Sequence, residues 1–191
     1  MQDDVAGAVA FLYLNWGTQP PLRHLLGSIV RQIVQEQDPL PAVVTQAHGA
    51  HILRGTVGGP SKQVITTLLH ELSQSRPVYI VIDGLDEFRE DTRNDPRGKE
   101  SRRRLLESIL AGSVKQRLIS LLITSRLLDE FRALIRKYAF FSVDLKAHHR
   151  DVDIFVDQKF DNSGWLQGLA RHNPELRSEV KGKISNSCEN M

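Results

Sequence analysis

The sequence has little cysteine and no long apolar run, and both absences limit what the protein can be. Cys188 is the only cysteine among 191 residues, which excludes an internal disulfide and is typical of a reducing compartment. No apolar run reaches the roughly 18 residues of a membrane span, and the first residues are acidic, unlike those of a signal peptide. A net charge of only +2 does not indicate a nucleic-acid or membrane partner. We therefore expect a cytoplasmic protein that binds neither.

Short apolar runs are present instead, and they predict buried strands. The apolar fraction is 40% and the charged fraction 25%, which is typical of a soluble globular domain with one core. The runs predict strands at residues 8–14, 78–83, 118–126 and 140–145. The first three are continuously apolar instead of alternating, so we expect both faces of their sheet to be covered.

The segments between these runs have the apolar spacing of helices. Stripes of leucine, isoleucine and valine predict helices over residues 21–35, 61–75, 101–114 and 127–139. Ser61 is suited to cap the second of them. Strands that alternate with helices predict an α/β fold with a mainly parallel sheet. Only helical patterns follow residue 146, so we divide the chain into a domain at 1–146 and the start of a helical region at 147–191.

Carboxylates follow the second strand directly, in "VYIVIDGLDEF" (78–88). Ligands of parallel sheets bind beyond the carboxyl ends of the strands. Asp83 is placed to hold Mg²⁺ through its water shell, and Asp86 and Glu87 are candidates to orient or deprotonate an attacking water. The alternative is an acidic, solvated loop that only ends the strand.

A second polar segment follows the next strand, in "LLITSR" (121–126). Thr124, Ser125 and Arg126 could sense or neutralise a phosphate, although such residues also begin ordinary loops. One predicted helix separates the two segments, so both should reach the same edge of the sheet. Together they form a stronger signal than either segment alone.

These two segments resemble the Walker B and sensor 1 segments of NACHT-class P-loop signalling NTPases (STAND NTPases), in particular the fungal nephrocystin-like type. The flanking segments "VAFLYLNWGTQPPLRHLLGSIVRQIV" (9–34) and "FFSVDLKAHHRDVDIFVDQKF" (140–160) are also similar to that group. The resemblance implies a three-layer P-loop NTPase fold with strand order 5-1-4-3-2. The first three apolar runs would be strands 2, 3 and 4, which are neighbours in that order.

The resemblance also implies roles for the site residues. Asp83 matches the Mg²⁺-associated acid, Asp86 and Glu87 match the acidic pair that includes the proposed catalytic acid, and Arg126 matches the sensor arginine. Members of the class use ATP or GTP with Mg²⁺ as an assembly switch in signal transduction that resembles innate immunity. They couple an effector domain to a repeat sensor, often of ankyrin type.

The defining P-loop, G-x-x-x-x-G-K-[ST], is absent from the sequence. The nearest string, "GTVGGPSK" (55–62), has no Gly-Lys pair and follows a helical segment instead of a strand. The resemblance therefore implies a fragment of a larger protein that begins after the P-loop. We expect this chain alone to bind neither nucleotide nor Mg²⁺, and whether it is an enzyme stays open.

Two other functions are compatible with the sequence. The chain could be a short protein that has lost nucleotide binding and acts as an interaction module, by self-association or by pairing with intact relatives. It could also be a Mg²⁺-dependent phosphohydrolase that uses its carboxylates directly, but this needs acids at other strand ends, and the run at 140–145 offers only Asp144.

Two further expectations concern stability and surface. The run at 140–145 would be strand 5 without its neighbour, and each orphan backbone group would cost about 1–3 kcal/mol. We therefore expect a marginally stable, aggregation-prone chain. The arginines of "SRRRLL" (101–106) are expected to form a solvated helix face, because Glu100 and Glu107 flank them.

Overall fold

The structure is a computed structural model that divides the chain into two compact units. The units are Met1–Phe140 and Phe141–Met191, and each is described by itself. The described residues are 7–15, 17–35, 37–53, 55, 58–90, 95, 97–110, 119–126, 128–145 and 148–189. Residues 111–118 and 127, which include the ends of two predicted helices, lie outside them.

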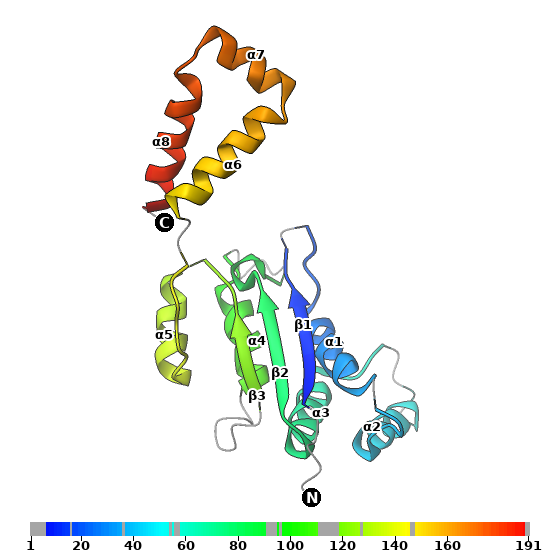
Figure 1. Cartoon of the computed structure of the whole chain (residues 1–191). Coiled ribbons are helices and arrows are strands. Elements are labelled where there is room, and N and C mark those ends of the chain that lie inside the picture. The colour runs from blue at the N-terminus through cyan, green and yellow to red at the C-terminus, as the bar shows by residue number, and fades with distance from the viewer. Residues whose placement is uncertain are drawn as a thin grey trace, which may run out of the picture. The chain divides into compact units, whose positions relative to one another are not determined.

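A small parallel sheet organises the first unit (Figure 1). Its strands are β1 (Ala8–Tyr13), β2 (Val78–Asp83) and β3 (Ile119–Ile123). They pair in the order β1-β2-β3, with Ala10 opposite Ile80 and Ile80 opposite Leu121. The prediction that the first three apolar runs pair as neighbouring parallel strands is confirmed.

Helices account for most of the remaining first unit. They are α1 (Leu22–Val34), α2 (Ala42–Leu53), α3 (Lys62–Ser75), α4 (Lys99–Leu110) and α5 (Asp129–Tyr138). The Ser61 hydroxyl accepts a hydrogen bond from the Val64 N–H at 3.4 Å, as its capping role predicts. The α/β class is confirmed, although the described chain is mainly helical.

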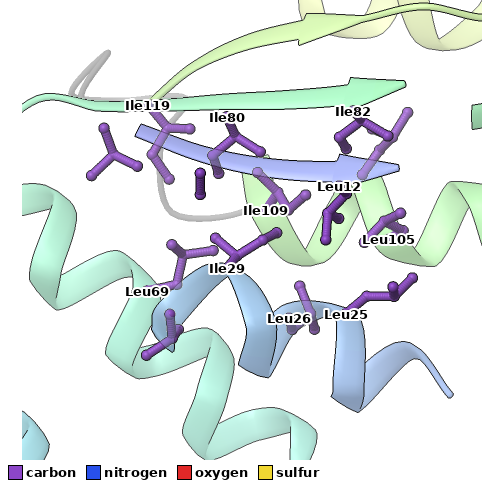
Figure 2. Close-up of a cluster of buried hydrophobic side chains, with 14 of the residues drawn as sticks. Leu12, Leu25, Leu26, Ile29, Leu69, Ile80, Ile82, Leu105, Ile109 and Ile119 are labelled. Atoms are coloured by element: carbon purple, nitrogen blue, oxygen red, sulfur yellow. The ribbon is translucent and has the colours of Figure 1, made fainter. Parts of the chain in front are cut away.

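One face of the sheet packs on helices and forms the core. Figure 2 shows Leu12, Ile80 and Ile82 above side chains of α1 and α4, among them Ile29 and Ile109. Ile29, Ile82 and Ile109 are fully buried. Each such side chain contributes about 1.5–3 kcal/mol through apolar burial, so this face holds the first unit together.

The opposite face of the sheet is exposed among the described residues, and the prediction of two covered faces is wrong for them. The strands have small or aliphatic side chains on the packed side, whereas the other side has several large apolar side chains together with Ser120 and Asp83. The exposed set, which we call the bare face, is Val9, Phe11, Tyr13, Tyr79 and Leu122, with exposed fractions of 44–74%. A continuous apolar strand therefore has only half of its side chains in the core here.

The fourth predicted strand, at 140–145, is also wrong. These residues have no regular secondary structure, and Phe141 and Leu145 are 92% and 90% exposed. An extended segment becomes a strand only by pairing, and no described strand pairs with it. Because the segment is exposed, water can satisfy its backbone groups, so the energetic cost expected for a buried orphan strand does not arise.

The second unit is a small helical cluster, as the sequence beyond residue 146 predicts. Its helices are α6 (His149–Asp161), α7 (Gly164–His172) and α8 (Leu176–Glu189). Val152, Val156 and Phe160 of α6 are buried against side chains of α7 and α8. No described helix in either unit combines the length and apolarity of a membrane span.

Candidate functional site

The carboxyl ends of β2 and β3 bring the two predicted polar segments together. The Thr124 hydroxyl donates a hydrogen bond to the Asp83 carboxylate and accepts one from the Gly84 N–H at 3.0 Å. The Thr124 carbonyl accepts from the Leu85 N–H at 3.0 Å. The acidic segment and the Thr-Ser-Arg segment therefore share one edge of the sheet, as the sequence predicts.

Gly84 makes the sharp turn that leaves β2. Its φ of 72° is in the left-handed region, and a Cβ there would lie 2.9 Å from the Leu14 carbonyl oxygen. Only glycine satisfies both conditions without strain. The chain then enters a short 3₁₀ helix, η1 (Leu85–Glu87), which directs Asp86 toward the end of β3.

Asp86 and Arg126 form the central ion pair of this edge. Arg126 Nε lies 2.6 Å from Asp86 Oδ2, and the Arg126 backbone N–H donates to Oδ1 at 3.1 Å. The Ser125 hydroxyl lies 3.3 Å from the same oxygen and 2.8 Å from the Arg126 carbonyl oxygen, so its one proton is shared between these two acceptors. The Asp86 side chain is only 6% exposed, whereas that of Arg126 is 68% exposed. The pair therefore fixes a guanidinium at the surface of the site.

The environment of Asp86 keeps it ionised. Burial by itself would raise the pKa of this carboxyl, but the hydrogen bonds and charge of Arg126 outweigh burial, and the pKa falls below the ordinary 3.8. A carboxylate with a low pKa is a weak base, and both of its oxygens already accept hydrogen bonds. Asp83 is exposed, whereas Glu87 as a whole residue is half-buried, as Asp86 is.

The ion pair predicts a specific pH dependence of stability. Because the folded pKa of Asp86 lies below its unfolded value, the contribution is present above about pH 4 and disappears as the pH falls through the folded pKa. We expect the unfolding free energy of the wild type to exceed that of Asp86→Asn at neutral pH, and the difference to shrink in acid. Urea unfolding of both proteins from about pH 6 to about pH 2.5 measures this. Asp129→Asn is the matched control, because Asp129 is fully exposed and pairs only at 3.8 Å.

Arg102 of α4 is a site residue that the sequence analysis missed. Its side chain is 5% exposed. It donates to the carbonyl oxygens of Asp86 at 3.0 Å and Phe88 at 3.2 Å, and pairs with Glu130 of α5 at 2.7 Å. The expectation of a solvated arginine face is thus wrong for Arg102, whereas exposed Arg103 and Arg104 fit it and pair with glutamates on α4.

The position of Arg102 carried a signal that spacing could have revealed. Arg102 lies three, four and seven residues before Leu105, Leu106 and Ile109, all of which are buried. That spacing places it on the apolar side of the helix, where a charge requires a partner. An arginine there indicates an ion pair with another element, which is Glu130.

Asp83 is the residue of this edge best suited to hold a metal. No group of three histidines, cysteines or carboxylates that could bind an ion occurs within the described ranges. One exposed carboxylate and a neighbouring hydroxyl suffice only for an ion that keeps most of its waters, as Mg²⁺ does when phosphates supply further ligands.

One family model covers all residues of the site at the ends of β2 and β3. The family model described as "Nephrocystin 3, N-terminal" matches residues 2–126. The chain belongs to this family. In this nephrocystin-like domain the match includes all three strands and ends at Arg126, so every residue of the ion pair and the acidic segment lies inside it. No curated protein and no solved structure matches the chain.

Proposed function

We propose that this nephrocystin-like domain is part of a NACHT-class P-loop signalling NTPase. We propose further that the residues at the carboxyl ends of β2 and β3 bind the terminal phosphates of Mg²⁺-bound ATP or GTP. The observation that carries the proposal is the meeting of Asp83, Thr124 and Arg126 at the carboxyl ends of adjacent parallel strands. Ligands of open parallel sheets bind at that position.

The proposed roles follow from the environment of each residue. Asp83 would hold a water of the Mg²⁺ shell, and the ion would neutralise phosphate charge when bound. Arg126 is exposed and fixed by Asp86, so it is suited to contact a terminal phosphate. Asp86 then serves mainly to orient Arg126, and Glu87 is the better candidate to orient a water. Ser125 supports Asp86 through its hydroxyl.

Among the described residues, the free edge of β3 is what we would expect if the sheet is a portion of a larger one. The order β1-β2-β3 is compatible with strands 2, 3 and 4 of the order 5-1-4-3-2. The outer edge of β1 is closed by the Gln32 side chain, which bonds the Phe11 N–H at 2.9 Å and its carbonyl at 3.0 Å. β3 pairs only with β2 among the described strands, which leaves room for strand 1. We propose a cytoplasmic switch with effector and repeat-sensor domains elsewhere.

The test is nucleotide binding by the 191-residue protein. The sequence contains no P-loop, so the chain alone should bind no ATP at micromolar concentrations, and the proposal predicts only residual, Mg²⁺-dependent binding in the range of about 1 mM or weaker. NMR titration should shift amides of the β2 and β3 ends. Arg126→Met should abolish the shifts, whereas Arg132→Met, which removes another exposed arginine, should not. An absence of Mg²⁺-dependent binding at several times this concentration would contradict the proposal.

The second candidate is an interaction module without nucleotide chemistry. The bare face favours it, because large exposed apolar side chains on a sheet are typical of a contact surface. The same titration separates the two functions. A phosphohydrolase that uses only its carboxylates ranks last, because β1 and β3 end without acids among the described residues.

A further inference from the structure

We propose that the groove between α1 and α3 is a docking site for an acidic amphipathic helix of a partner protein. The groove has a volume of about 610 Å³ and shares no residue with the site at the sheet edge. Its lining comes from most of the length of α1, with contributions from α2, α3 and the segment before α3. The proposal is independent of nucleotide binding.

The floor of the groove is apolar and has room for incoming side chains. Val30, Val34, Ile65 and Leu68 form this floor, and Gly27 lies between the charged rim positions. A Cβ on Gly27 would meet only Ile65 Cδ1, at an ordinary 3.9 Å. A partner can therefore approach the α1 backbone closely here and bury leucine-sized groups.

The rim of the groove is positively charged. Arg23 and Arg31 are exposed and line it, and neither forms an ion pair within the described part of the chain. α1 itself contains no acidic residue. A neighbouring pocket of about 340 Å³ shares Arg23 and is lined by two further cations, Lys62 and Arg104, and by one carboxylate, Glu90, so cations outnumber acids there. Uncompensated cations beside an apolar floor favour an anionic, amphipathic partner.

The spacing of the two arginines favours a helix over a small anion. Residues eight apart on α1 are about 12 Å apart along its axis, so a partner with two separated anionic groups matches them better than a single carboxylate or phosphate does. A helix with acidic residues two turns apart can contact both and still place its apolar face on the floor. Among the described residues, no phenylalanine, tyrosine or tryptophan lines the groove for base stacking, and a flat bilayer surface cannot enter it.

The test uses a synthetic helical peptide as the probe. A labelled peptide of about 15 residues would carry leucines at i, i+4 and i+7 and glutamates two turns apart beside them. Fluorescence anisotropy should show binding of the glutamate peptide at least tenfold tighter than of a version with lysines in place of the glutamates. Raising the salt concentration should weaken binding, because the rim charges are exposed.

Two kinds of variant test whether the peptide binds in the groove. The double variant Arg23→Glu/Arg31→Glu should weaken binding at least tenfold, whereas Arg171→Glu in α7 should not change it. Gly27→Leu fills the floor and raises helix propensity, and an unchanged urea midpoint of this variant would show that its loss of binding does not come from unfolding. Equal affinity for the two peptides, full binding by the double variant, or binding to phosphatidylserine vesicles without binding to the peptide would overturn the proposal.

Discussion

Replacing Arg102 with methionine should lower the free energy of unfolding by about 3 kcal/mol. Methionine keeps much of the side-chain volume, but Glu130 becomes a poorly solvated carboxylate without its partner. The carbonyl oxygens of Asp86 and Phe88 also lose a donor. Urea unfolding at pH 7, with the change taken from the midpoint at constant slope, measures this effect.

The matched control for Arg102 lies two residues further along α4. Arg104 is about half exposed and pairs with Glu100 at 2.9 Å, so Arg104→Met should change stability by less than about 0.5 kcal/mol. Adding Glu130→Gln to Arg102→Met should recover part of the loss, because it removes the unpaired charge. If Arg102→Met is as stable as Arg104→Met, Arg102 does not hold the acidic segment in place.

The second large effect concerns the bare face. We expect the purified chain to self-associate and to unfold with a Tm below about 55 °C. The reason is the set of exposed apolar side chains on β1, β2 and β3, since large apolar patches drive association. The double variant Phe11→Thr/Leu122→Thr keeps β propensity and should shift most of the protein to monomer in sedimentation velocity.

A control variant changes apolar side chains that lie elsewhere. Ile52 and Leu53 on α2 are 62% and 89% exposed, and Ile52→Gln/Leu53→Gln should leave association largely unchanged. A monomeric wild-type protein with a reversible, cooperative melt above about 55 °C would contradict the prediction that the bare face drives self-association.

Local pattern was sufficient to predict the main elements of the first unit. The apolar runs of β1 and β2 are short and end at turn residues, so their positions follow from the sequence. The leucine and isoleucine stripes of α1 and α3 do the same. Their alternation predicts a parallel sheet, and a parallel sheet requires that Asp83 and Thr124 meet at one edge.

What the sequence could not provide were contacts that depend on tertiary neighbours. Continuous apolar strands do not reveal whether a covering layer is present, so the exposure of Phe11 was not predicted. Phe140–Leu145 has the composition of a strand, but strand formation depends on a partner. The ion pair of Asp86 with Arg126 and that of Arg102 with Glu130 join residues distant in sequence. Local spacing indicates that Arg102 needs a partner, but it does not identify the partner of either arginine.

The most direct test of the central claim is to locate a divalent ion by paramagnetic line broadening with Mn²⁺ in place of Mg²⁺. Amide resonances of Asp83, Gly84 and Thr124 should broaden first, ATP should strengthen the effect, and Asp83→Asn should abolish it. Broadening that centres on the carboxylates of α6, or that persists unchanged in Asp83→Asn, would contradict the claim that the ends of β2 and β3 form the metal–phosphate edge of a nucleotide site.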